Sequence, residues 1–345
     1  RFSEPSRIPL WVRLVDLTQN LELKTQNFTS MRSYSLLAPA KINLYLEILG
    51  DRPDGYHELV MVMQSIDLAD RIELRANGTD QFRVHCDHEQ VPADQSNLAY
   101  RAAELMSQQF PEAFARYGAV DITIDKQIPV GAGLAGGSTN AAAVLVGLDM
   151  IWELGLTQIE IQELGALLGS DVPFCIVGGT ALATGRGEKL DGLPDLENMH
   201  LVLAKYRSLS VSTPWAYKTY RQQFGASYLC QPGDLECRRQ QVHSGPMVHA
   251  IAHRDEAQIG KLLHNDLEKV VLPEYPQVAN LRQVFQRFGT LGTLMSGSGP
   301  TVFALAISQE QAQQLLSQVR ATIPDPDLEL WTAKFIPAGI QVAKP

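Results

Sequence analysis

A glycine-rich turn between a predicted strand and a predicted helix is the segment best suited to chemistry. It spans residues 128–140 and holds four glycines, after the alternating strand pattern of residues 120–125. Glycine lets the backbone approach a ligand and turn its N–H groups inward. A helix beginning near Ser138 would aim unpaired N–H groups and the positive end of its dipole at the same place. The turn therefore predicts a binding site for an anion such as a nucleotide phosphate.

Two other phosphate loops and a plain structural turn are the alternatives for this segment. Residues 131–136 fit G-x-G-x-x-G, but residues 157–168 again predict helix, where a dinucleotide fold needs a strand ending in an acidic residue. A Walker A loop needs a lysine after its last glycine, and Gly137 is followed by Ser138 and Thr139. A tight turn that binds nothing stays open on this motif alone.

Two further segments carry charged side chains that could act beside such a loop. Apolar residues alternate over residues 42–48, a half-buried strand that would project Lys41 and Asn43 from the same edge. Asp171 precedes Val172-Pro173, and proline disfavours helical conformation at the residue before it, so we expect Asp171 on the turn leaving the preceding helix. A solvated lysine and a capping aspartate are the simpler interpretations of the two residues.

Aromatic residues mark a possible base-binding surface. Tyr56 and His57 lie in a turn rich in Pro, Gly and Asp, and an aromatic face beside a hydrogen-bonding group is what recognition of a pyrimidine requires. A second aromatic could come from a helix with Thr213 as its expected N-cap and Pro214 at its first position. Packing on the core is the alternative for all of these rings.

Composition bounds the class of protein. The 345 residues are 45% hydrophobic and 19% charged, which suits a soluble globular chain of two domains. The formal net charge of -9 gives no general attraction to nucleic acid or anionic lipid, and no apolar run is long enough to span a membrane. An anionic substrate must therefore be held by a local site.

The cysteines and histidines point to no metal. Cys86, Cys175, Cys230 and Cys237 show neither zinc spacing nor a disulfide framework, which favours a reducing cytoplasm. The pair at His85 and His88 has no third ligand at suitable spacing, so the metal ligands stay unknown.

The first thirty residues differ from the rest. Residues 1–30 lack a secretory core and precede Met31, so we expect an upstream extension, disordered or derived from an expression leader. A transit peptide directing the chain to the plastid stroma is the lesser possibility.

Three motifs in order carry a resemblance to a known family. Residues 129–142, 38–44 and 295–303 resemble the ATP loop and the two outer motifs of the GHMP kinases, named for galactokinase, homoserine kinase, mevalonate kinase and phosphomevalonate kinase. The turn containing Tyr56 and His57 is similar to that of members acting on a cytidine diphosphate alcohol in isoprenoid biosynthesis. The resemblance covers the chain from Ser33 onward.

The resemblance implies roles for particular residues. Asp171 would accept the proton of the substrate hydroxyl, while Lys41 stabilises that oxygen and the moving phosphoryl group. Asn43, Tyr56, His57 and Tyr217 would bind the substrate, with Trp215 as the alternative to Tyr217. ATP and Mg²⁺ would be the cofactors, with Ser138 a guess for the metal. The loop residues expected to bind ATP are Pro129, Val130, Gly131, Ala132, Gly133, Leu134, Ala135, Gly136, Gly137, Ser138 and Thr139. Ala132 and Ala135 stand where many relatives have glycine, which the loop tolerates if their φ stays negative.

The implied architecture is α+β, with an N-terminal domain like ribosomal protein S5 domain 2 and a C-terminal ferredoxin-like α/β plait. We place the ATP-binding domain at residues 31–190, the second domain at 191–345 and the active site between them. Residues 225–245 lack periodicity and are expected to form an exposed insertion, and Ser96 is expected to cap a helix over 96–109. We expect a monomer or weak homodimer without nucleic-acid or membrane partners.

Two further hypotheses compete. The chain could phosphorylate another alcohol, such as homoserine or mevalonate, or it could bind nucleotide without catalysis. Tyr56 and His57 argue against the first, and the joint presence of Lys41 and Asp171 argues against the second.

Overall fold

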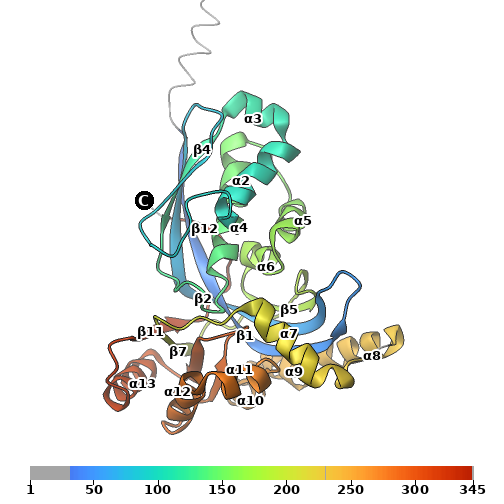
Figure 1. Ribbon diagram of the computed structural model, residues 1–345, viewed down its shortest axis with the longest axis vertical. Coiled ribbons are helices and arrows are strands. Elements are labelled where there is room, and N and C mark those ends of the chain that lie inside the picture. The colour runs from blue at the N-terminus through green and yellow to red at the C-terminus, as the bar shows by residue number, and fades with distance from the viewer. Residues whose placement is uncertain (1–31, 230, 344–345) are drawn as a thin grey trace, which may run out of the picture.

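The structure is a computed structural model that describes residues 32–229 and 231–343. Two lobes, each built on its own sheet, stack along the long axis of the molecule (Figure 1). The expectations for residues 1–30 and for Cys230 lie outside the described residues. No helix in the described ranges is long and apolar enough to cross a membrane.

The first sheet is organised around one long antiparallel pair, β1 (Ser33–Asp51) and β2 (His57–Ala76). Its main path runs β12-β1-β2-β4-β3, and β5 and β6 extend it beside β2. The register shifts between Pro39 and Ala40 and again between Asn43 and Tyr45, which are the two places flanking Lys41. The remaining strands of this sheet are β3 (Arg83–Cys86), β4 (Val120–Asp125), β5 (Thr180–Gly185), β6 (Lys189–Gly192), β8 (His264–Asn265) and β12 (Gln341–Val342).

One group of helices lies along this sheet in the upper lobe (Figure 1). At its centre is α4 (Gly136–Trp152), most of whose residues are buried. Gly147 permits the close packing, because a Cβ there would lie 2.1 Å from the Leu74 side chain of β2. The other helices of the group are α2 (Leu98–Gln109), α3 (Pro111–Tyr117), α5 (Gln158–Leu168) and α6 (Val172–Val177).

The second sheet has the order β11-β7-β10-β9, with every neighbouring pair antiparallel. In chain order this is 4-1-3-2, and helices fill the first and last connections, which confirms the predicted ferredoxin-like plait. The strands are β7 (His200–Tyr206), β9 (Gly292–Met295), β10 (Val302–Ala306) and β11 (Leu328–Lys334).

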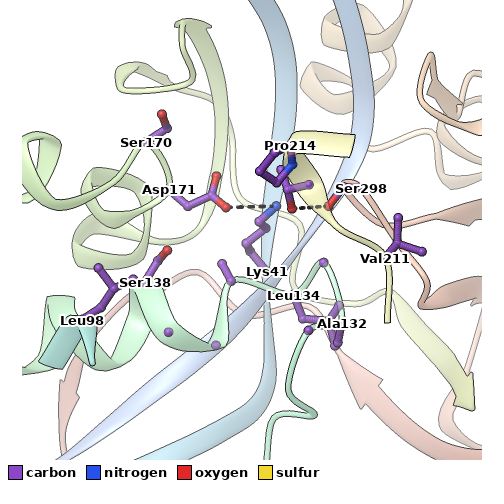
Figure 2. Close-up of a pocket in the computed structure, with 18 of the residues that line it drawn as sticks. Lys41, Leu98, Ala132, Leu134, Ser138, Ser170, Asp171, Val211, Pro214 and Ser298 are labelled. Atoms are coloured by element: carbon purple, nitrogen blue, oxygen red, sulfur yellow. Dashed lines mark hydrogen bonds and ion pairs between the residues drawn. The ribbon is translucent and has the colours of Figure 1, made fainter. Parts of the chain in front are cut away.

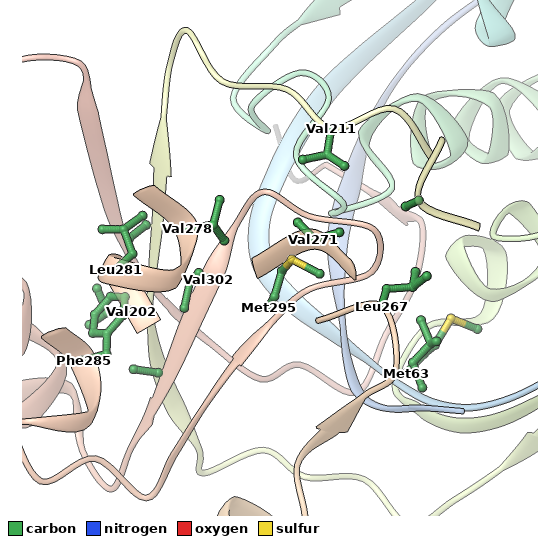
Figure 3. Close-up of a cluster of buried hydrophobic side chains, with 14 of the residues drawn as sticks. Met63, Val202, Val211, Leu267, Val271, Val278, Leu281, Phe285, Met295 and Val302 are labelled. Atoms are coloured by element: carbon green, nitrogen blue, oxygen red, sulfur yellow. The ribbon is translucent and has the colours of Figure 1, made fainter. Parts of the chain in front are cut away.

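The helices of the second lobe are α7 (Thr213–Phe224), the 3-10 turn η1 (Gly225–Ser227), α8 (Pro232–His243), α9 (Pro246–Ala252), α10 (Glu256–Lys261), α11 (Glu268–Glu274), α12 (Pro276–Gln286) and α13 (Gln309–Thr322). Of these, α7, α11, α12 and α13 contribute to an apolar cluster that includes Leu281, Phe285 and Val302 (Figure 3).

The two lobes interleave. β8 pairs in parallel with β1, and β12 pairs with β1 in antiparallel register. These two strands lie after residue 191 in the chain but belong to the first sheet. The predicted domain boundary near residue 190 therefore does not separate the two sheets cleanly, and it stays a prediction.

Several local predictions were wrong. Asn97, not Ser96, caps α2, because its side chain accepts the Ala99 N–H. Ser212, not Thr213, caps α7, so Pro214 is the second helical residue. Residues 232–243 form helix α8 within the expected insertion. Val172 is the first residue of α6, because a proline at the second position of a helix loses no intrahelical hydrogen bond.

Candidate functional site

The glycine loop joins β4 to α4 and needs backbone conformations that favour glycine. Gly131 has φ 62° and Gly133 has φ 74°. A Cβ on Gly133 would lie 2.3 Å from the carbonyl oxygen of Ser296, so no larger residue fits. The helix begins at Gly136, two residues earlier than the predicted start near Ser138. The loop therefore ends in unpaired helix N–H groups at Gly136 and Gly137.

One of the two loop alanines departs from expectation. Ala135 has φ 60°, a left-handed conformation that costs a residue with a Cβ about 1–2 kcal/mol, whereas Ala132 has no positive φ. The expectation that both alanines keep negative φ was correct for Ala132 and wrong for Ala135. Ala135 takes this conformation as the N-cap of α4.

A buried carboxylate that sequence reasoning missed holds both ends of the loop. Asp70 of β2 is 0% exposed and accepts the N–H groups of Gln127 and Ile128, each at 2.8 Å. It also accepts the side-chain amide of Asn140 at 2.7 Å and pairs with the ammonium of Lys126. The only local sign of this carboxylate was a lysine, Lys126, just before the loop. Its partner Asp70 lies 56 residues away, so the sequence does not reveal the pair.

The second lobe and β1 hold the middle of the loop. The Ser296 hydroxyl donates to the Gly133 carbonyl at 3.0 Å, and the Lys41 N–H donates to the Leu134 carbonyl at 3.2 Å. Asn265 in turn donates to the carbonyls of Met295 and Gly297, both at 2.8 Å. The third predicted motif therefore lies against the loop.

Lys41 and Asp171 lie opposite each other at the centre of the cleft (Figure 2). The Lys41 ammonium is 3.5 Å from an Asp171 carboxylate oxygen and donates to Asn43 Oδ1 at 2.7 Å. The side chain of Lys41 is 5% exposed and that of Asp171 is 29% exposed. Asn43 thus fixes the lysine, and the more accessible carboxylate faces the cavity.

The aromatic residues lie beyond this pair. The rings of His57 and Tyr217 are 5.0 Å apart, and Tyr56 is 53% exposed at the rim. The Nε2 atom of buried His57 has no hydrogen-bond partner. Burial lowers the pKa of His57, assisted by the Arg221 cation and opposed by Asp51, so the imidazole is held neutral.

Of the two aromatic residues considered for substrate binding, Tyr217 is better placed than Trp215. Tyr217 lines the cavity, whereas Trp215 packs edge-on against Tyr275 at 5.5 Å. Burial and the nearby Asp171 carboxylate raise the pKa of Tyr217, so its phenol stays neutral.

The glycine loop, Lys41, Asp171, Tyr56, His57 and Tyr217 line one cavity of about 750 Å³ between the lobes. Of the predicted site residues only Thr139 does not line it; its hydroxyl is buried in the wall without a hydrogen-bond partner. The cationic lining residues that sequence reasoning did not assign to the site are Lys126, Arg186, Lys218 and Arg221. An acidic chain needs a local group of cations to hold an anionic substrate, and these cavity residues provide one.

No group of three or more His, Cys, Asp or Glu side chains within the described ranges could hold a metal by itself. The free thiols of Cys86, Cys175 and Cys237 form no disulfide.

Comparison with known proteins identifies the family. The models for the N-terminal and C-terminal domains of GHMP kinases match residues 97–179 and 247–325. The chain is 67% identical to a 4-diphosphocytidyl-2-C-methyl-D-erythritol kinase from Nostoc punctiforme, covering 90% of this chain and 99% of that protein. It is 62% identical to the protein of that name from Microcystis aeruginosa, over 90% and 100% of the two chains.

Solved structures agree. A crystal structure of 4-(cytidine 5'-diphospho)-2C-methyl-D-erythritol kinase shares 31% identity with a TM-score of 0.66, covering 87% of this chain and 98% of that one. A homoserine kinase from Cytophaga hutchinsonii shares the fold at 18% identity, with a TM-score of 0.69 over 90% and 97% of the chains.

The chain belongs to the GHMP kinase family, whose members use ATP as phosphate donor. Within it, the chain groups with the 4-diphosphocytidyl-2-C-methyl-D-erythritol kinases.

Proposed function

We propose that this kinase transfers the γ-phosphoryl group of ATP to the 2-hydroxyl of 4-diphosphocytidyl-2-C-methyl-D-erythritol. The products are the 2-phosphate and ADP, in the methylerythritol phosphate route to isopentenyl diphosphate. The observation that carries the proposal is the order of groups along one cavity. The glycine loop bonds to the backbone of Lys41 in β1, and the Lys41 ammonium faces Asp171. Tyr56, His57 and, beside His57, Tyr217 line the same cavity where the chain turns from β1 into β2.

The central pair suits the transfer step. Asp171 would accept the proton as the hydroxyl oxygen forms its bond to phosphorus and the bond to the ADP oxygen breaks. Lys41 would stabilise the negative charge on that oxygen and on the phosphoryl group. Asn43 keeps the ammonium in place through its 2.7 Å hydrogen bond.

The loop residues would bind the ATP phosphates through backbone N–H groups. Their orientation is fixed by bonds from both lobes, so little ordering is left to occur on binding. The residues proposed to bind ATP are 129–138, which line the cavity, and Thr139, which lies behind the cavity wall.

The aromatic end would bind the cytidine. We propose that the base stacks on Tyr56 and Tyr217, which both line the cavity. The Nε2 of His57, which makes no hydrogen bond and lies 3.6 Å from an Asp51 carboxylate oxygen, would bond to the polar edge of the base. A group lacking the base would leave this buried nitrogen unsatisfied, which favours the cytidine compound over smaller alcohols.

The proposal includes Mg²⁺. The hydroxyl of Ser138, which lines the cavity, is an oxygen donor of the kind Mg²⁺ takes together with substrate phosphates. When bound, the ion would neutralise phosphate charge. We also propose a cytoplasmic monomer or weak homodimer, in keeping with the free thiols.

The test is ATP consumption by the purified protein with Mg²⁺ and a panel of acceptors. The panel contains 4-diphosphocytidyl-2-C-methyl-D-erythritol, the same alcohol without cytidine, homoserine and mevalonate. Turnover with the cytidine compound alone is expected. Turnover with another acceptor would leave the catalytic pair in place and refute the substrate assignment. Binding of ATP without turnover of any acceptor would refute catalysis.

A further inference from the structure

Tyr56 is the most exposed member of the aromatic group, and one cation lies against its ring. The guanidinium carbon of Arg186 is 4.9 Å from the ring centroid of Tyr56. In the part of the chain that the structure describes, no aromatic ring contacts Tyr56 and no hydrogen bond to its hydroxyl is present. Its backbone is held at both ends, because its N–H donates to Asp54 at 3.1 Å and its carbonyl accepts the Arg52 N–H at 2.9 Å.

Arg186 is itself fixed by the first lobe. It lies in the turn between β5 and β6, and its Nη2 donates to the carbonyl of Ala166 in α5 at 3.2 Å. Its backbone N–H donates to Glu188 at 2.6 Å, and its Nε is 4.0 Å from the same carboxylate. The side chain is 24% exposed and lines the cavity. These bonds anchor the cation outside the turn that carries Tyr56, and Asp54 of that turn adds an electrostatic attraction.

A cation anchored on one face of an aromatic ring restricts the ring. Cation–π attraction favours the orientation in which the ring face meets the guanidinium, and a planar guanidinium also stacks well. An exposed tyrosine without this contact would lose rotamer freedom when a base stacks on it, which weakens binding. The face of Tyr56 turned away from Arg186 is left for a ligand.

We propose that Arg186 is a positioning residue for acceptor recognition, holding the Tyr56 ring ready to stack on the cytosine base. This inference rests on the proposed function. Arg186 acts through Tyr56, makes no contact with the reacting atoms and leaves the ATP end of the cavity unchanged.

The test is a double-mutant cycle between Arg186→Gln and Tyr56→Leu. The readouts are KM for the cytidine acceptor, KM for ATP, kcat, and the Kd of CDP measured by calorimetry. Arg186→Gln is expected to raise the acceptor KM and the Kd of CDP by about three- to thirtyfold, the range of a single cation–π contact, with kcat and KM for ATP unchanged. In the Tyr56→Leu background the same substitution is expected to change neither value by more than about twofold. Arg186→Lys, which keeps the charge without the planar fork, should lie between.

The chain offers a matched control in Arg116. Its guanidinium carbon is also 4.9 Å from a tyrosine ring centroid, that of Tyr117, but neither residue lines the cavity. Arg116→Gln removes a contact of the same kind and charge and should leave both KM values and the Kd of CDP as in the unmodified protein.

Three outcomes would overturn the inference. An equal loss from Arg186→Gln with and without Tyr56 would assign Arg186 a direct contact with the acceptor. No loss with Tyr56 present would show that the ring needs no support. A fall in kcat together with a higher KM for ATP would indicate a general structural role.

The same measurements distinguish a failure of the proposed function from a failure of this inference. If the unmodified protein neither binds CDP nor uses the cytidine acceptor, both proposals fall. If it does both, and Tyr56→Leu weakens them while Arg186→Gln does not, only the inference falls.

Discussion

The glycine loop and the Asp51–His57 turn form opposite ends of one cavity, and they are held in different ways. The loop is fixed by buried groups, including the fully buried Asp70 and the hydroxyl of Ser296. The turn is fixed by partly exposed arginines. Arg221 donates to Asp51 at 2.7 Å and to the Gly55 carbonyl at 3.2 Å.

This difference has an energetic consequence. Hydrogen bonds to a buried charge are costly to break, whereas a partly exposed ion pair contributes about 0–1 kcal/mol and is screened by salt. The loop end, where we propose that the phosphates of ATP bind, is therefore built to keep one shape. The turn end, where we propose that the acceptor binds, can be altered at low cost in stability.

The largest predicted effect lies between the two ends. Asp171→Asn removes the proposed proton acceptor and should lower kcat by about 10²- to 10⁴-fold. The Kd of ATP, measured by calorimetry with a nonhydrolysable analogue, should change little, because the loop bonds do not involve Asp171. A variant as active as the unmodified protein would remove Asp171 from the mechanism.

Asp70→Asn tests the rigidity of the loop end. It leaves the Lys126 ammonium buried without its charge partner, which costs about 3–5 kcal/mol in comparable buried pairs. We expect a lower Tm and a higher KM for ATP, with the acceptor KM little changed. Asp67→Asn is the matched control, because Asp67 lies on the same strand and is exposed. Equal losses in the two variants would contradict the special role of Asp70.

The same contrast explains what the sequence could predict. The strand, loop and helix around residues 120–152 were predicted because local periodicity and glycine chemistry determine them. The contact between the side chains of Lys41 and Asp171 could be predicted only from the family resemblance, because the two residues are 130 positions apart. Asp70 and Arg186 were missed because their partners, Lys126 and Tyr56, lie 56 and 130 positions away and share no local motif with them.

Local patterns also failed in the second lobe for physical reasons. Helix α8 has almost no apolar face, and only Val242 in it is buried. Its Arg238 and Arg239 instead pair with Glu47 and Glu58 of the first sheet. Helical periodicity cannot reveal a helix that is held by ion pairs to another lobe.

A smaller effect is expected at Ala135 in the loop. Glycine adopts its left-handed conformation without a Cβ clash, so Ala135→Gly should relieve up to about 1 kcal/mol and raise the Tm by up to about 1.5 °C. KM for ATP should stay constant if the surrounding bonds hold the loop. A rise in KM for ATP would instead show that the alanine stiffens the loop, and that the buried bonds alone do not.

The smallest effect is a pH dependence at the acceptor end. Burial, and then the Arg221 cation, lower the pKa of His57 in the folded protein against the opposing effect of Asp51. A depressed histidine pKa contributes stability that is present above the unfolded value of about 6.5 and is lost as pH falls through the folded value. The Tm of the unmodified protein relative to His57→Gln should therefore fall slightly from pH 8 to pH 5. Because glutamine does not titrate, the difference between the two Tm values cancels the contributions of other groups. A relative Tm that rises toward pH 5 would mean that Asp51 outweighs burial, and that the turn holds its imidazole charged.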